Sequence, residues 1–166
     1  MKINCEINGE EFLEFDESNA ILMDHIGNNL VEQSKKVFKL DGFESHCRLG
    51  GDLPDEQLKQ FCDLIDEQYG DLYVRHIGKD WKLFKEFEWT EPGLVVVWFT
   101  KKDSDDLVAF FAFKVCLNDE DKLVLHLCEN HMSKAFKDMG YGYSLSKQFN
   151  DFCHTTRYID INKELL

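Results

Sequence analysis

Two closely spaced glycines in the last third of the chain could hold a phosphate group. Gly140 and Gly142 stand in KDMGYG (137–142), which follows the apolar run LVLHLC (123–128) and opens a helical pattern. Unpaired backbone N–H groups gather where a chain enters a helix, at the positive end of the helix dipole, and phosphates bind there. Gly140 would permit a positive φ, and Gly142, lacking a β-carbon, would let a pyrophosphate approach the backbone. A turn without a ligand is the alternative, because G-x-G alone is a weak motif.

A candidate general base comes directly after the same apolar run. Glu129 ends the expected strand, and a carboxylate there could take a proton from an attacking amine; a solvated glutamate is the alternative. His126, Cys128 and His131 stand nearby and resemble a ligand or nucleophile cluster. Alternation along a strand would put His126 and Cys128 on one face and His131 on the other. We therefore expect packing roles for these three side chains, with no metal site and no Cys–His catalysis.

The elements that must position these residues begin with a hairpin, a helix and a strand. Asn8-Gly9 separates two partly alternating runs and predicts a short hairpin, although the second run could also begin a helix. Apolar residues recur at helical spacing over 18–38. A short strand is expected over 43–49.

Two further helical segments follow. Pro54 suits the first position of a helix, and Gly70 is expected to lie past its end. The aromatic-rich segment 71–89 predicts another helix or a helical loop, and Pro92 ends it.

The second half of the chain changes to the pattern of strands. Three apolar runs, at 94–100, 107–115 and 123–128, are joined by short polar turns. Links this short favour antiparallel neighbours, so we predict a three-strand meander, covered on both faces because its runs are apolar at nearly every position. A helical pattern then returns, and RYIDI (157–161) could add one more strand.

Length and charge limit the protein's class. With 166 residues, we expect a single domain over 1–166, with about 1–17 as an N-terminal extension. A formal charge of −13 argues against direct binding of nucleic acid and would attract a basic partner; a surface that only maintains solubility is the alternative. We find no apolar run long enough to cross a membrane, and expect a soluble protein of the cytoplasm and/or nucleus with its six cysteines reduced.

The order of these features resembles a known superfamily. Helix, helix, three-strand meander and K-x-x-G-x-G resemble the GCN5-related N-acetyltransferases (GNAT). Four stretches, within about 20–153, are similar to the NatD-type histone N-terminal acetyltransferases: KVFKLDGFESHC, WKLFKEFEW, LVAFFAF and CENHMSKAFKDMGYG. The resemblance implies an α+β fold with a central, mostly antiparallel sheet flanked by helices, lacking the usual C-terminal strand pair.

The resemblance also implies an activity: acetyl transfer from acetyl-CoA to the free α-amine of a basic protein tail, such as a histone tail. Glu129 would be the base, Cys128 occupies the position of a tyrosine in the proton relay, and Trp81 and Tyr73 would contact the substrate. The residues that match the pyrophosphate-binding motif are Lys137, Asp138, Met139, Gly140, Tyr141 and Gly142.

The sequence departs from this pattern in three places. A thiol at Cys128 is a poorer hydrogen-bond partner than a tyrosine, and Asp138 and Met139 replace basic residues beside an anionic cofactor. Only 24 residues follow Gly142, so a second copy of the chain could complete the sheet edge. A GNAT-like protein without catalysis, serving as a binding module, is the alternative.

Overall fold

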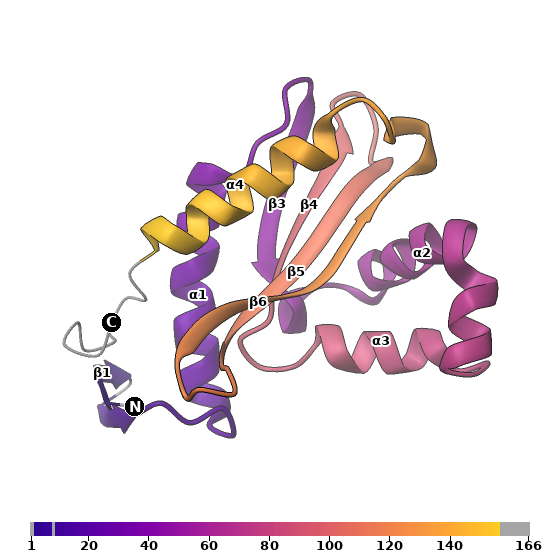
Figure 1. Ribbon diagram of the computed structural model, residues 1–166. Helices are drawn as coiled ribbons and strands as arrows, with labels where there is room; N and C mark the ends of the chain where they lie inside the picture. The colour runs from indigo at the N-terminus through magenta and orange to yellow at the C-terminus, as the bar shows by residue number, and fades with distance from the viewer. Residues whose placement is uncertain (1, 8, 157–166) are drawn as a thin grey trace.

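The computed structural model describes residues 2–7 and 9–156 (Figure 1). The helices are α1 (Ala20–Val37), α2 (Asp55–His76), α3 (Trp81–Trp89) and α4 (Tyr141–Thr155), with short 3-10 turns at Gly50–Asp52 and Lys134–Phe136. The strands are β1 (Lys2–Ile7), β2 (Glu10–Glu14), β3 (Phe43–Leu49), β4 (Val95–Lys101), β5 (Leu107–Leu117) and β6 (Leu123–Met132).

The central sheet lies between two layers of helices. Its strands run in the order β3-β4-β5-β6, and each neighbouring pair is antiparallel. Helices α1 and α4 cover one face, and α2 and α3 cover the other (Figure 1). The expected α+β fold with a mostly antiparallel sheet flanked by helices is confirmed.

The central strands are apolar on both faces because both faces are buried. Val95 and Val97 of β4 belong to the core under α1 and α4, whereas Val96 and Trp98 belong to the core under α2 and α3. Side chains of a strand alternate between faces, so a strand covered on both sides needs an unbroken apolar run. The prediction of a covered three-strand meander is confirmed.

The first half of the chain also follows its pattern. β1 pairs antiparallel with β2, which confirms the hairpin, and α1 and β3 confirm the helix and the strand after it. Gly27 lies inside α1 at a point of close contact with the rest of the fold. A β-carbon there would stand 2.6 Å from Cδ2 of Leu49 and 3.0 Å from the Cα of Gly93. The missing side chain lets the helix pack closely against the sheet.

The expected end of the second helix is wrong. Helix α2 continues through Gly70 to His76. A glycine inside a helix costs only about 1 kcal/mol relative to alanine, which tertiary contacts can outweigh. A β-carbon at Gly70 would lie 2.0 Å from Oδ1 of Asp66, a carboxylate that binds Lys82 at 2.7 Å. The glycine therefore makes room for an ion pair between α2 and α3.

The last helix forms as predicted, and both edges of the central sheet are open in the part of the chain that the structure describes. α4 confirms the helix expected after the glycines, whereas the strand proposed for 157–161 lies outside the described residues. Within residues 2–7 and 9–156, no further strand lies beside β3 or β6. No helix in this part of the chain is long and apolar enough to span a bilayer.

Candidate active site

Strand β6 contains a bulge next to the predicted base. Leu127 lies opposite Phe113 of β5, but Glu129 lies opposite Ala112, so Cys128 is an extra residue in the ladder. The strand then continues to Met132. Glu129 therefore lies inside β6, although the sequence predicted that the strand ends at this residue.

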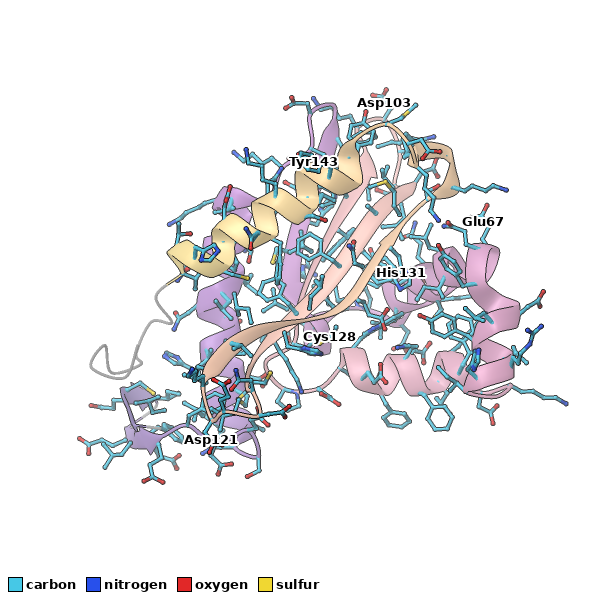
Figure 2. The ribbon with its side chains drawn as sticks, viewed as in Figure 1. Glu67, Asp103, Asp121, Cys128, His131 and Tyr143 are labelled. Carbon is cyan, nitrogen blue, oxygen red and sulfur yellow. The ribbon has the colours of Figure 1, made fainter. Side chains whose placement is uncertain are left out.

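The bulge changes which side chains share a face. His131 lies opposite Phe110, which belongs with Ala112 to the core under α2 and α3. Glu129 and His131 therefore point to this side, and Cys128 also packs against it. Figure 2 shows His131 between β6 and α2. The expectation that His131 lies on the face opposite Cys128 is wrong, because alternation fails across an extra residue.

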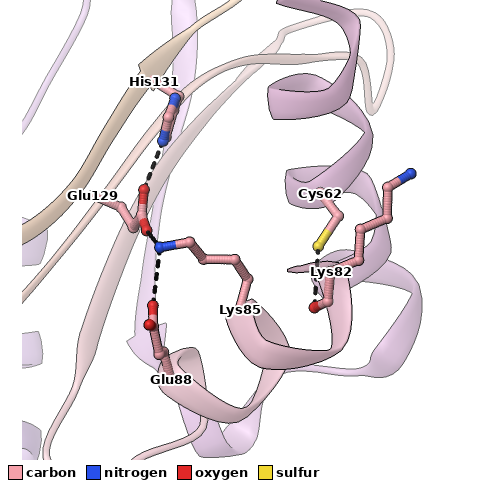
Figure 3. Close-up of polar contacts among 6 residues, drawn as sticks. All are labelled: Cys62, Lys82, Lys85, Glu88, Glu129 and His131. Carbon is pink, nitrogen blue, oxygen red and sulfur yellow. Dashed lines mark hydrogen bonds and ion pairs between the residues drawn. The ribbon is translucent and has the colours of Figure 1, made fainter. Parts of the chain in front are cut away.

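Both carboxylate oxygens of Glu129 are engaged. Oε1 lies 2.5 Å from Nζ of Lys85 on α3, and Oε2 lies 2.6 Å from Nε2 of His131 (Figure 3). Lys85 also donates to Glu88 at 3.0 Å. Only 5% of the Glu129 side chain is exposed, and 13% of the Lys85 side chain. The result is a buried network that joins β6 to α3.

This network sets the charge state of the carboxylate. Burial alone would raise the pKa of Glu129, but the hydrogen bonds from His131 and Lys85, with the charge of Lys85, outweigh it and lower the pKa. Burial opposes the charge of Lys85 as well, and the hydrogen bonds to Glu129 and Glu88 raise its pKa. Glu129 is thus held as a carboxylate in an ion pair.

Cys128 lies beside this network with an unreactive thiol. Burial raises its pKa to about 11, so the thiol stays protonated near neutral pH. Its Sγ lies 3.6 Å from the backbone oxygen of His126 in a weak hydrogen bond. This environment does not activate a nucleophile, and a catalytic role for Cys128 stays a prediction.

The two predicted substrate residues lie at different depths. Trp81 is only 2% exposed and packs 4.9 Å from the ring of Tyr73, so it anchors α3 in the core. Tyr73 reaches the network directly, because Nζ of Lys85 lies 5.6 Å from its ring centroid. Burial raises the pKa of Tyr73, and the Glu129 carboxylate adds to this rise. The structure thus places Tyr73 near the Glu129 network, whereas Trp81 is buried in the core.

The glycine loop enters α4 through left-handed backbone. Gly140 has φ +81° and precedes the first residue of the helix, and Asp138 also has a positive φ, of 68°. Because Gly140 offers no side chain, nothing caps the helix there. Among the described residues, no hydrogen bond engages the backbone N–H groups of 138–143.

The space in front of these N–H groups is open. A β-carbon built at Gly140 or Gly142 would meet no atom within 4 Å. A cavity of about 430 Å³ lies here, and its lining includes Tyr69, Lys137 and both glycines. Tyr141 instead packs its ring on Phe43, and the side chain of Met139 is exposed. Unpaired N–H groups in a loop that lines an open cavity form a suitable cradle for an anion.

Tyr69 connects the loop to the buried network. Nζ of Lys137 donates to the Tyr69 hydroxyl at 2.9 Å, and the Tyr69 ring lies 6.3 Å from the ring of His131. No sequence signal assigned a role to Lys85 or to Tyr69, which follows the buried Ile65 of α2 by four residues. Its spacing on α2 did not distinguish a core residue from one that lines a cavity.

The described residues contain no cluster of His, Cys, Asp or Glu side chains arranged to hold a metal ion. The polar groups of the site are therefore the loop N–H groups, the Glu129 network and the tyrosines.

Comparisons with known proteins address the fold. The sequence matches no protein-family profile and no curated protein sequence. Among solved structures, the chain is similar to ElaA of Escherichia coli, with a TM-score of 0.50, 16% identity, and coverage of 71% of this chain and 74% of ElaA. A ribosomal-protein-alanine N-acetyltransferase from Brucella melitensis gives a TM-score of 0.47, 9% identity, and coverage of 68% and 72%. A GNAT family acetyltransferase from Staphylococcus aureus gives 0.43, 17% identity, and coverage of 68% and 78%. The similarity to ElaA shows a shared fold, a mixed α/β arrangement with an antiparallel sheet flanked by helices.

Proposed function

We propose that this protein transfers an acetyl group from acetyl-CoA to the free α-amine of a basic protein tail, such as a histone tail. One observation carries the proposal: the N–H groups of the 138–143 loop make no hydrogen bond among the described residues, the loop lines a cavity of about 430 Å³, and Tyr69 links this cavity to His131 and so to Glu129. An anion cradle and a proton-accepting pair are the two parts that such a transfer requires.

The loop suits the pyrophosphate of acetyl-CoA. Backbone donors at the start of α4 and the Lys137 ammonium would bind it, and the Asp138 carboxylate would oppose it. Gly142 leaves the backbone accessible at the first turn of the helix. Acetyl-CoA supplies the activated thioester carbonyl, and these residues position it.

The acidic surface favours a basic acceptor. A second cavity, of about 330 Å³, is lined by Asp66, Glu67 and Asp71 as well as Tyr69 and Arg75. Tyr69 lines both cavities, so the acidic one adjoins the cradle. Together with the net charge of −13, these carboxylates would draw a lysine- or arginine-rich tail toward the site.

A binding module without catalysis is the second candidate. In the described part of the chain, the outer edge of β6 has no strand beside it, so a partner chain or a second copy could add one. A third candidate keeps acetyl-CoA and replaces the protein tail by a small amine.

The test has two stages. Acetyl-CoA is first titrated while thermal unfolding is followed, because a ligand that binds only the native state must raise the midpoint saturably. Release of coenzyme A is then measured with a basic peptide, with the same peptide acetylated at its N-terminus, and with a charge-neutral peptide of equal length. Turnover on the free basic peptide alone supports the proposal. Stabilisation without turnover on any amine indicates a binding module, and the absence of stabilisation refutes both acetyltransferase candidates.

A further inference from the structure

We infer that His131 is the general base of the proposed transfer and that Glu129 is the residue that positions it. The inference rests on the proposed function and changes the role that the sequence suggested for Glu129. Its evidence is the geometry of the Lys85–Glu129–His131 network.

Glu129 has no free oxygen to offer an acceptor. Lys85 occupies Oε1 at 2.5 Å, and His131 occupies Oε2 at 2.6 Å. The side chain is almost fully buried, so little of the carboxylate is open to an amine unless the amine displaces one of these partners. Breaking a buried ion pair leaves an uncompensated charge, which makes that displacement costly.

The same contact fixes the state of the imidazole. A carboxylate only accepts hydrogen bonds, so Nε2 of His131 must carry the hydrogen directed at Glu129. In the neutral ring, Nδ1 then holds the lone pair. Figure 3 shows this second nitrogen turned away from Glu129. No hydrogen bond to it occurs among the described residues, so Nδ1 is free to accept a proton.

The ring is also held in place beside the cradle. It stacks on Phe110, with ring centroids 5.3 Å apart and planes 29° apart. Asn130 and Met132, its neighbours on β6, line the cradle cavity together with Tyr69. The His131 side chain is 12% exposed, compared with 5% for Glu129. His131 is therefore the more exposed side chain of the pair, and its ring lies 6.3 Å from that of Tyr69, which lines the cradle cavity.

Charges from every side act on this ring. Glu129 on β6 stabilises the imidazolium, and Glu88 acts on it through Lys85. Lys85 on α3 and Lys137 in the loop oppose it, with Tyr69 of α2 between Lys137 and the ring. The ring therefore lies between a carboxylate partner on β6 and cations from α3 and the loop.

The chemical step balances with His131 as acceptor. Nδ1 takes one proton from the α-ammonium group, and the amine nitrogen then attacks the thioester carbonyl. The C–N bond forms as the C–S bond breaks, and the departing coenzyme A thiolate takes the second proton from nitrogen. His131 returns the first proton to water. The products are the N-acetylated tail, coenzyme A and one proton.

Two measurements test the inference. Nitrogen-15 NMR of the histidine rings, in the protein without ligands, should show the hydrogen of His131 on Nε2. In a peptide acetylation assay, His131→Gln should lower kcat by about 10²-fold or more, with the KM for acetyl-CoA within about twofold of the parent. Added imidazole should partly restore His131→Ala. His126→Gln, on the same strand, is the matched control and should keep the parental kcat.

A hydrogen on Nδ1, or a His131→Gln variant with more than half of the parental kcat, overturns the inference and leaves the proposed function intact. A parent protein that neither binds acetyl-CoA nor acetylates any amine refutes the proposed function instead, and with it a catalytic role for His131.

Discussion

Lys85 and Glu129 lie 44 residues apart in the chain, yet Nζ of Lys85 is 2.5 Å from Oε1 of Glu129. The contact joins α3 to the bulged strand β6, with both side chains largely buried. Two buried charges stabilise the fold only as a pair, because removing one leaves the other buried without an opposite charge.

Lys85→Met should therefore lower the free energy of unfolding by about 3 kcal/mol, since it leaves Glu129 buried without its cation. Denaturant unfolding monitored by circular dichroism measures this. Lys59→Met is the matched control: its pair with Asp63 lies at the surface, with 74% and 52% of the side chains exposed, and should cost about 1 kcal/mol or less. Equal losses in the two variants would contradict a buried, mutually dependent pair.

The lowered pKa of Glu129 predicts how stability depends on pH. A carboxyl whose folded pKa lies below its unfolded value stabilises the protein fully above the unfolded pKa, and this stabilisation is lost as the pH falls through the folded pKa. The stability difference between the parent and Glu129→Gln should be constant above about pH 5 and should shrink below about pH 4.3, the ordinary pKa of a glutamate. Chemical unfolding of both proteins from pH 7 to pH 3 gives the difference. A stability difference between the two proteins that grows as the pH falls would contradict a lowered pKa for Glu129.

Asp138 should weaken the binding of acetyl-CoA. Its carboxylate belongs to the loop that faces the proposed pyrophosphate site, and asparagine accepts the same positive φ. Asp138→Asn should tighten the dissociation constant for acetyl-CoA by about two- to fivefold at low ionic strength, and less at 0.5 M salt. Calorimetry measures both conditions, and Asp151→Asn, an exposed change later in α4, should have little effect. Unchanged affinity for Asp138→Asn at low salt would place the anion elsewhere.

Cys128 should be dispensable as a nucleophile. Because burial raises its pKa to about 11, little thiolate exists near neutral pH. Alkylation by iodoacetamide at pH 7.5, followed by peptide mass spectrometry, should label Cys128 more than tenfold more slowly than a free cysteine peptide. No acetylated-protein intermediate should be detectable in the parent or in Cys128→Ala. The turnover of Cys128→Ala should stay within about threefold of that of the parent. Complete inactivation with intact folding would instead support a covalent route through the thiol.

Local signals in the sequence predicted most of the fold. The apolar runs of β4, β5 and β6 are short and separated by polar turns, and Gly140 marks the helix entrance, where the structure has φ +81°. These features depend on neighbours in the chain. Gly70 misled the prediction of the end of α2, because contacts between α2 and α3 outweigh its low helix propensity.

The arrangement of the site could not be read in the same way. An unbroken strand pattern through Cys128 gives no sign of the bulge, which depends on the pairing of β6 with β5. The Lys85 partner of Glu129 comes from a distant helix, and nothing in its spacing identifies it. Trp81 and Tyr73 were predicted together as substrate residues, but the packing of α3 buries the first.

The measurement that tests the central claim most directly is an amide NMR titration of the protein with acetyl-CoA. If the loop at the start of α4 binds the pyrophosphate, the N–H signals of residues 138–143 should shift together and saturably. Gly142→Val, which fills open space, should fold normally and lose these shifts. Shifts absent from 138–143 at millimolar acetyl-CoA, or equal in the parent and Gly142→Val, would contradict the account.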